Sequence, residues 1–327
     1  MPDLSYVSAH PRGDLVAVAS REGWLTVWSP STDRVIAIHK LPDAINKAAW
    51  LADGSCLIAT SGDSLHVWSS DGATRVAEVN TGHQVVRTFA VHPHHPALAT
   101  VGGDAVVRLW SADGWTSREL LQQEGEGSGG GTAIAVSERA IVTGYRSGWF
   151  AACTPDGEFL AAGQLFGSAV AALAVFPDQT TFIAGGNSGG TKLVIGADDP
   201  WVGGAGWQHP PRPISTNTIE VAADGQWLAA HSDGTAELHR SIDERLGQSF
   251  GSAFHARRRE WSPNDIVSSA CFLPGTPLIA TSHFGGYLLL WHRDAQRSQR
   301  IAFGQGRPTW LGVTTSGAAW RTLTAAP

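Results

Sequence analysis

The sequence predicts an all-β chain folded as a single seven-bladed β-propeller of four-stranded antiparallel blades. An internal repeat returns at intervals of 40 to 44 residues in all but its last step, which is 52. Each copy also contains several short apolar runs separated by turn residues. The composition favours strands over long helices, because 327 residues include 38 Gly and 14 Trp but 1 Met.

The clearest copies of the repeat are LTVWSPSTDRVIAI from Leu25, LHVWSSDGATRVAEV from Leu65 and VRLWSADGWTSREL from Val107. In each, an apolar run ends in Trp-Ser before a polar turn. Weaker copies read FAACTPDGEFLAAG, LVIGADDP, AELHRSIDERLG and LLLWHRDAQRSQRIAF. Alignment of the seven copies places one set of residues at a single equivalent position: Trp28, Trp68, Trp110, Cys153, Ile195, His239 and Trp291.

Two further strand-like runs precede this position in each copy, as VVRTFAVHP and ALATVGG do in the third. The repeat unit is therefore four short antiparallel strands. One such sheet cannot cover both of its apolar faces, whereas sheets arranged radially cover one another. We expect the propeller to occupy residues 1–306, with QRIAF as the outer strand of blade seven, and residues 307–327 to form a tail with an extra hairpin.

The third copy resembles the WD-repeat family in Gly82 and His83, Thr100, Asp104 and Trp110. The resemblance implies that His83, Thr100, Asp104 and Trp110 form a structural hydrogen-bonded tetrad and that the chain docks other proteins. It extends over about residues 4–303 and is weakest in copies four to six, which lack the Trp. In the first two copies, Glu22 stands where the family has Asp, and Asp63 is offset by one residue.

Charge and cysteine content restrict the partners and the compartment. A formal charge of −6 argues against general binding to nucleic acid, which needs a basic face. No apolar run has the length of a membrane span, so we expect no membrane partner. Three cysteines far apart in apolar runs, Cys56, Cys153 and Cys271, indicate buried free thiols and a cytoplasmic protein.

Two glycine motifs superficially suggest catalysis or nucleotide binding. GEGSGGG at residues 125–131 contains the GxGxxG spacing, but the strand-like run TAIAVSE follows it where a phosphate site needs a helix. Gly186 to Gly190 matches GxSxG, yet it falls in an expected hairpin. We therefore expect no cofactor and no enzymatic activity. A hydrolase built from channel residues of several blades is a distant alternative.

The 13 histidines support a different alternative, a zinc-handling accessory protein. His231 and His283 lie in equivalent hairpin loops of adjacent copies six and seven, and imidazoles from neighbouring loops can bind zinc. No ligand quartet has a diagnostic spacing, and exposed turns tolerate His. The expectation is therefore no metal, with His231 and His283 as the alternative ligands.

Large aromatic residues indicate where a protein partner would bind. Four residues before the Trp position, where the third strand leaves its turn, stand Trp24, Trp149 and Tyr287. Such rings are typical of binding hot spots, although they could equally pack against the next blade.

The long loop between copies six and seven adds a basic segment near blade one. Its arginines could hold an acidic or phosphorylated segment, or be a solvated charge run. The function predicted from the sequence is a non-enzymatic scaffold that docks protein partners on this loop face. From this loop, the residues assigned to partner binding are Arg257, Arg258, Arg259 and Trp261.

Overall fold

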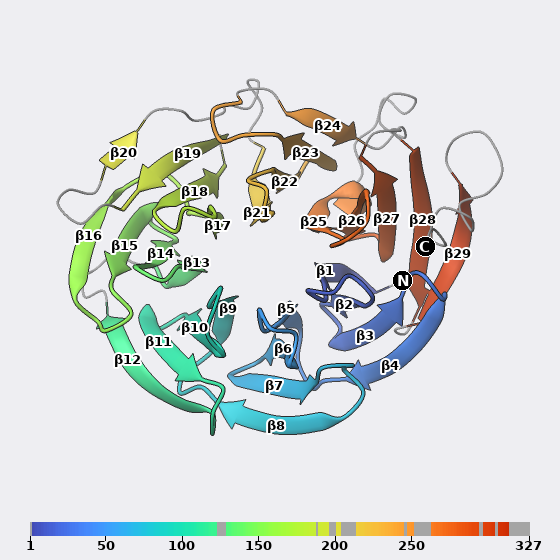
Figure 1. The fold of residues 1–327 in the computed structure, drawn as a ribbon, viewed down its shortest axis with the longest axis horizontal. Coiled ribbons are helices and arrows are strands. Elements are labelled where there is room, and N and C mark those ends of the chain that lie inside the picture. Colours follow the sequence, from blue (N-terminus) through green and yellow to red (C-terminus); the bar gives the residue numbers. More distant parts are fainter. Residues whose placement is uncertain are drawn as a thin grey trace.

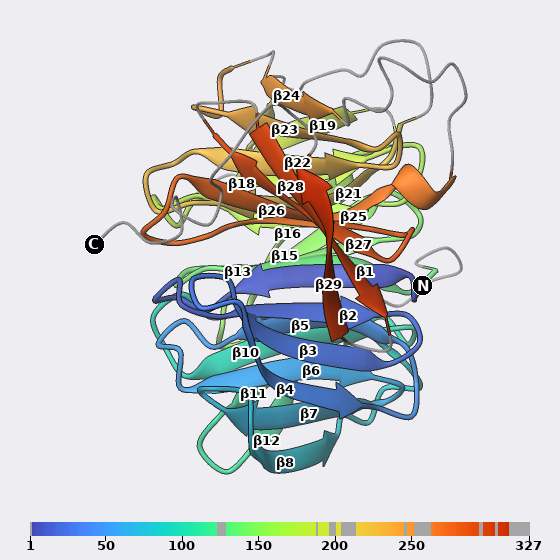
Figure 2. The same cartoon turned by 90° about the vertical axis from the view of Figure 1, so that its right-hand side faces the viewer.

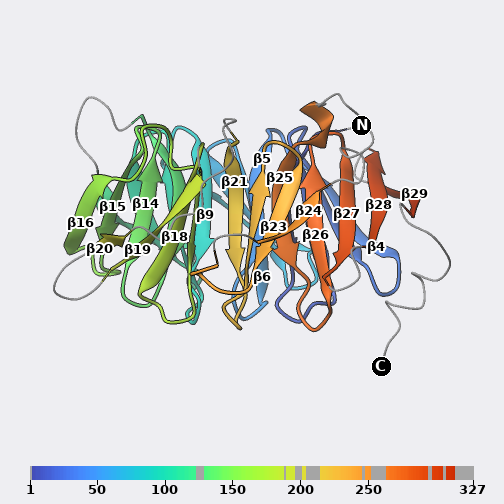
Figure 3. The same cartoon turned by 90° about the horizontal axis from the view of Figure 1, so that it is seen from above.

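The chain folds into a closed ring of seven antiparallel sheets, which confirms the predicted fold class (Figure 1). The computed structural model describes residues 2–122, 129–187, 189–195, 201–203, 214–244, 247–251, 263–293, 297–304 and 307–313. In these ranges the helical content is a single 3-10 turn, η1 (Pro263–Asp265). Figure 3 shows the ring edge-on as a disc, and in Figure 1 the first strand of each blade lies innermost.

The first four blades each take four consecutive strands, ordered from the centre outward as they occur in the chain. Their short strands match the apolar runs of the repeat. Blade one is β1 (Leu4–Ala9), β2 (Val16–Ser20), β3 (Trp24–Ser29) and β4 (Arg34–Lys40); blade two is β5 (Ile45–Trp50), β6 (Cys56–Ser61), β7 (Ser64–Ser69) and β8 (Arg75–Asn80); blade three is β9 (Val86–Val91), β10 (Ala97–Gly102), β11 (Val106–Ser111) and β12 (Thr116–Gln122); blade four is β13 (Gly131–Val136), β14 (Ile141–Tyr145), β15 (Trp149–Cys153) and β16 (Phe159–Gln164).

The remaining blades follow the same order, and blade seven carries a fifth strand. Blade five is β17 (Ala172–Val175), β18 (Thr181–Gly186), β19 (Gly189–Val194) and β20 (Trp201–Gly203); blade six is β21 (Thr216–Val221), β22 (Trp227–His231), β23 (Thr235–His239) and β24 (Gln248–Gly251); blade seven is β25 (Val267–Phe272), β26 (Leu278–His283), β27 (Tyr287–His292), β28 (Arg297–Gly304) and β29 (Arg307–Val313).

The core is divided among the seams between blades, because alternate side chains of a strand point to opposite faces of its sheet. In β3, Leu25 and Val27 pack toward blade two, whereas Trp28 packs toward blade seven. Within the described residues, each of the seven neighbouring pairs shares one apolar cluster, except that blades three and four share two. Residues at the aligned Trp position are all buried: Trp28, Trp68, Trp110, Cys153, Ile195, His239 and Trp291.

The ring closes by side-chain packing between blades one and seven, since all strands of blade seven come from the C-terminal part of the chain. Val7 and Trp28 of blade one meet Leu288 and Ile301 of blade seven in one buried cluster. The Ser269 hydroxyl donates a hydrogen bond to the Val7 carbonyl oxygen at 3.3 Å. QRIAF lies in β28, the fourth strand of blade seven, as expected.

The predicted boundary at residue 306 falls inside the sheet of blade seven. Residues 307–313 form β29, which pairs antiparallel with β28 and lies beside β4 of blade one (Figure 2). The first strand of the expected extra hairpin is thus β29, and it pairs with the edge of blade seven. The expected second strand, at residues 319–323, lies outside the described residues.

The two flat faces of the disc carry different loops. We call the front face the one that carries the turns between second and third strands, such as residues 21–23 and 146–148, and the connections between blades. The back face carries the turns between first and second strands and between third and fourth strands, such as residues 137–140 and 154–158. The docking surface predicted from the sequence is the front face.

Closure without strand exchange predicts that side-chain packing at the seam between blades one and seven contributes strongly to the stability of the ring. Leu288→Ala empties a position that is 0% exposed and is expected to lower the free energy of unfolding by about 2–5 kcal/mol in urea denaturation. Val76→Ala, at a position 55% exposed on β8, is the control and should change it by less than about 0.5 kcal/mol. Equal effects of the two substitutions would contradict the closure described here.

Candidate docking face and central channel

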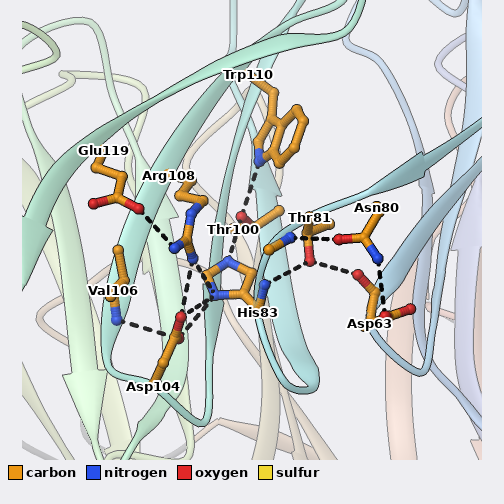
Figure 4. Close-up of polar contacts among 11 residues, drawn as sticks. Asp63, Asn80, Thr81, His83, Thr100, Asp104, Val106, Arg108, Trp110 and Glu119 are labelled. Atoms are coloured by element: carbon orange, nitrogen blue, oxygen red, sulfur yellow. Dashed lines mark hydrogen bonds and ion pairs between the residues drawn. The ribbon is translucent and has the colours of Figure 1, made fainter.

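A chain of buried hydrogen bonds links the four side chains that resemble the WD-repeat tetrad (Figure 4). The Trp110 indole N–H donates to Thr100 Oγ1 at 2.9 Å, and Thr100 Oγ1 lies 2.9 Å from His83 Nε2. His83 Nδ1 lies 2.8 Å from Asp104 Oδ1. A neutral imidazole with its proton on Nδ1 satisfies every step: Thr100 donates to His83, and His83 donates to Asp104. The four residues are thus brought together as a structural unit.

Arg108 extends this chain in a way that the motif alone does not indicate. Its guanidinium lies 3.0 Å from Asp104 Oδ2 and 2.7 Å from Glu119 Oε1, on the next strand. Burial raises the pKa of Asp104, but hydrogen bonds from Arg108 and His83 outweigh it, so the pKa stays below its usual range. Burial lowers the pKa of His83, partly offset by Asp104. A charged Asp104 beside a neutral His83 is the favoured state.

Blade seven contains a similar hydrogen-bonded chain of Trp, Thr and His, but its histidine comes from a different place in the blade. Trp291 donates to Thr281 Oγ1 at 3.0 Å, and Thr281 contacts His283 Nε2 at 3.0 Å. His283 lies at the end of the second strand rather than in the preceding loop, and its Nδ1 lies 3.0 Å from the Asp265 carbonyl oxygen. Both ring nitrogens of His283 are therefore engaged by protein atoms.

The alternative zinc ligands belong to separate hydrogen-bonded sets. His231 is 0% exposed, and its Nε2 lies 3.7 Å from Glu237 Oε2, which His239 also approaches at 3.3 Å. His283 contacts Thr281 and the Asp265 backbone instead. In the part of the chain that the structure describes, no group of three His, Cys, Asp or Glu side chains is arranged to hold a metal ion.

The aromatic residues predicted on the front face differ in exposure. Trp149 is 41% exposed at the start of β15. Trp24 is half-buried at the equivalent place in β3, with the Lys40 ammonium 5.7 Å from its ring centroid. Tyr287 is only 4% exposed, so the expectation that it offers contact area is wrong.

Three neighbours bury Tyr287. Its ring stacks on His283 with centroids 4.4 Å apart, its hydroxyl donates to Asp265 at 3.0 Å, and the Arg300 guanidinium lies 3.8 Å from its centroid. Of the two interpretations offered for these aromatic residues, partner contact and packing within the propeller, the second applies to Tyr287. The predicted loop residues Arg257, Arg258, Arg259 and Trp261 lie outside the described residues.

Neither glycine motif has the context that its chemistry needs. Gly131 begins β13, a strand, so the glycine-rich run leads into no helix N-terminus. Gly186 pairs with Gly189 across the antiparallel hairpin of β18 and β19, in contrast to the strand-to-helix turn of a nucleophile elbow. Ser188 itself lies outside the described residues.

A β-bulge recurs where the first strand of a blade begins, next to the front mouth of the central channel. Pairing with the second strand skips one residue or two in every blade except blade five. A bulge re-aims the side chain of the extra residue. The skipped residues that line the channel mouth are Ser5, Asn46, Lys47, Arg87, Thr132, Asn217 and Ser268.

Four of these bulge residues clamp neighbouring blades. Ser5 donates to the Ile45 carbonyl oxygen, Asn46 to that of Val86 at 3.0 Å, Thr132 to that of Val170 at 2.6 Å and Asn217 to that of Val267 at 2.7 Å. The acceptors Ile45, Val86 and Val267 begin the first strand of the next blade, and Val170 lies two residues before β17.

Deeper in the channel, an acid and a base from different blades lie near an aromatic ring. The Lys47 ammonium lies 5.4 Å from the Tyr6 ring centroid, and Glu220 accepts a hydrogen bond from the Phe272 amide at 3.1 Å. Burial raises the pKa of Glu220 to about 7, opposed by that bond and by Lys47. Burial lowers the pKa of Lys47 to about 8, opposed by Glu220.

These channel residues were not identified from the sequence, although the repeat contains a signal for them. Within the first strand of its blade, Arg87 is the second residue, Lys47 the third and Glu220 the fifth. The repeats were aligned on the third strand, and turns of unequal length separate it from the first. A separate alignment of first strands would have placed Arg87 and Lys47 at positions that face the channel.

Asp104→Ala tests the blade-three hydrogen-bond chain. The substitution leaves the His83 and Arg108 donors facing each other 2.7 Å apart without their shared acceptor. We expect the free energy of unfolding in urea to fall by about 1–3 kcal/mol. Asp113→Ala, an exposed turn residue of the same blade, is the control. If the control lost as much stability, the chain would have no structural role.

Glu220→Gln tests the environment of the channel acid. With its pKa raised in the folded state, Glu220 contributes stability below the unfolded value of 4.5 and loses it as pH rises through about 7. The Gln variant, which stays neutral and can keep the bond to Phe272, is expected to melt at a higher temperature than the wild type at pH 8. The difference should disappear at pH 4. A pH-independent difference would contradict the burial of this carboxyl.

Comparison with known proteins agrees with the geometry of blade three. The family model described as WD domain, G-beta repeat, matches residues 75–111, which span β8 to β11. A solved structure of U3-55K superposes with a TM-score of 0.70 at 11% identity, covering 86% of this chain and 88% of that chain, and this likeness shows the fold. No curated protein matches the sequence. The resemblance to the WD-repeat family is therefore confirmed over residues 75–111, and the fold of the chain is a seven-bladed β-propeller.

Proposed function

We propose that this protein is a non-enzymatic scaffold that docks protein partners on the front face of its propeller. WD40 propellers generally mediate protein interactions and are in general non-catalytic. The observation that carries the proposal for this chain is Trp149, a large ring 41% exposed on a front-face turn. Exposed aromatic rings that a partner buries on binding supply much of the binding energy in protein interfaces.

The turn before Trp149 holds the ring in place. Gly148 has φ of 84°, and a Cβ at this position would lie 2.0 Å from the Phe166 carbonyl oxygen. Only glycine fits such a turn. The Gly148 carbonyl accepts hydrogen bonds from Leu165 and Phe166 at 2.9 and 3.2 Å, so the loop that follows β16 is tied to it. A side chain presented on such a rigid turn loses little backbone entropy on binding.

The state of the cysteines supports a non-catalytic role in a reducing compartment. Cys56, Cys153 and Cys271 are all free thiols. Burial raises the pKa of each, to about 11 for Cys153, which keeps the thiols protonated and poorly nucleophilic. The described part of the chain contains no helix long and apolar enough to cross a membrane. The proposal therefore includes a cytoplasmic location, where thiols are kept reduced.

The basic loop remains part of the proposal. Arg257, Arg258 and Arg259 beside Trp261 would pair with an acidic segment of the partner, because guanidinium groups bind carboxylates in a bidentate geometry. Trp24 of blade one would contribute contact area on the same face. This arrangement predicts a protein partner, and neither a nucleic acid nor a membrane.

Trp149→Ala tests the docking face, with Phe159→Ala as a matched control. Phe159 is 62% exposed and belongs to the same blade, but it follows a back-face turn. Affinity capture of partners from cells that produce the protein, quantified by mass spectrometry, should lose its specific partners with Trp149→Ala and retain them with Phe159→Ala. For a purified partner, the loss of affinity should be about 2 kcal/mol.

Thermal melting of both variants separates binding from packing. Unchanged melting temperatures with lost capture would support the proposal. A less stable Trp149→Ala protein that captures the same partners would contradict it, because the ring would then act in the core.

A further inference from the structure

The half of the central channel nearer the back face contains a cavity of about 300 Å³, which we call the rear cavity. First-strand residues of blades one to six form its described lining, and it reaches the last residues of these strands, such as Val91, Val136 and Val221. Small-molecule sites in proteins have volumes of about 300–1,000 Å³. The rear cavity is therefore large enough for one small organic molecule.

The two sides of the rear cavity differ in chemistry. Every described lining residue from blades three, four and five is aliphatic, as Ile134 and Leu173 are. The polar and charged lining residues, which include Lys47 and Glu220, come from blades one, two and six. These three blades and blade seven form one continuous arc of the ring, so the polar residues share one side. A ligand that fits both sides has a charged end and an apolar end.

The Lys47 ammonium is half-buried and has no neutralising partner. Its described contacts are the rings of Tyr6 and Phe89, whose centroids lie 5.4 Å away. The described hydrogen bonds of this residue, to Thr60, involve only its backbone. Within the described residues, no carboxylate oxygen lies within 4.0 Å of the ammonium. A cation is thus held ready for an anionic group of a ligand.

The Glu220 carboxyl is engaged through one of its two oxygens. Oε1 accepts a hydrogen bond from the Phe272 amide at 3.1 Å, and Oε2 has no donor among the described residues. Glu220 and Lys47 each oppose the effect of burial on the pKa of the other, so the two charges interact although they form no ion pair. The Ser8 hydroxyl on the same side is buried and, in the described structure, lacks a hydrogen-bond partner. Buried polar groups normally have one.

We propose that the rear cavity binds a free α-amino acid with an apolar side chain. The ammonium of the ligand pairs with Glu220, its carboxylate pairs with Lys47, and its side chain lies against the aliphatic side of the cavity. An α-amino acid carries both charged groups on one carbon atom, so both can face one side while the side chain faces the other. This arrangement matches the division of the lining between the two arcs of the ring.

Other small ligands fit the rear cavity less well. An anion without an ammonium would face the Glu220 carboxylate, and a cation without a carboxylate would face the Lys47 ammonium. Each would leave one partly buried charge without a partner, which is costly. An amino acid with a polar side chain would place polar atoms against aliphatic residues that offer no hydrogen bond. A zwitterion with an apolar side chain avoids all three costs.

Isothermal titration calorimetry of the full-length protein at neutral pH tests the inference with defined probes. The probes are L-valine, L-leucine, L-methionine and L-phenylalanine, and at least one is expected to bind with one molecule per chain. The references are the analogues of each probe that lack the ammonium or the carboxylate, such as isocaproate and isoamylamine for leucine. They should bind about 10-fold more weakly or worse. Failure of all four probes to bind at millimolar concentration, or equal binding of the analogues, would overturn the inference.

Substitutions then locate the binding. Lys47→Met and Glu220→Gln are each expected to weaken it by about 10-fold or more, as loss of a charge-assisted hydrogen bond does. Lys192→Met on β19 and Glu158→Gln in an exposed back-face turn remove the same groups outside the channel and should leave binding unchanged. Thermal melting establishes that each variant is folded. Equal effects of the channel and control substitutions would contradict the assigned site.

A pH profile of the unsubstituted protein tests the site independently of any variant. Binding needs a charged Glu220, above its pKa of about 7, and a protonated Lys47, below its pKa of about 8. Tyr6 and Cys271, which also interact with Glu220, stay neutral in this range because burial raises their pKa values. The affinity for the amino acid should therefore be highest between these two values and fall on both sides. An affinity that does not change with pH would refute the pairing.

Discussion

The fold depends on the mutual burial of neighbouring sheet faces. Every described blade is apolar on both faces, and each of the eight clusters of the described core joins two blades. A single blade cannot bury both of its own apolar faces, so the ring must close. Packing at the seam between blades one and seven closes it without exchange of a strand. The polar chain of His83, Thr100 and Asp104 supplements this packing by satisfying groups that the blade buries.

Closure determines where functional residues can lie. Because the inner ends of all first strands converge on one axis, residues distant in the chain, such as Arg21 and Phe284, become neighbours at the channel mouth. Turns of the front face are fixed by strands on both sides, so Trp149 is presented on a rigid support. A surface that is already ordered before binding loses less entropy when a partner docks, which is what the proposed docking function requires.

The features that repeat in every blade could be predicted from the sequence. The Trp position and the four-strand unit follow from local pattern, and the side chains of His83, Thr100, Asp104 and Trp110 meet as the family resemblance implies. Tyr287 could not be predicted, since Asp265 and Arg300 from other elements bury it, while Trp149 at the equivalent position is exposed. The channel cations also escaped prediction, because bulges and unequal turns obscure which first-strand residues face the axis.

Amide hydrogen exchange of the protein, free and in complex with a captured partner, tests the central claim most directly. If the front face docks the partner, protection on binding should appear in the turns at residues 21–24 and 146–149. The back-face turns at residues 137–140 and 154–158 should exchange at the same rate in both states. Protection confined to the back-face turns or to the outer strands would contradict the account.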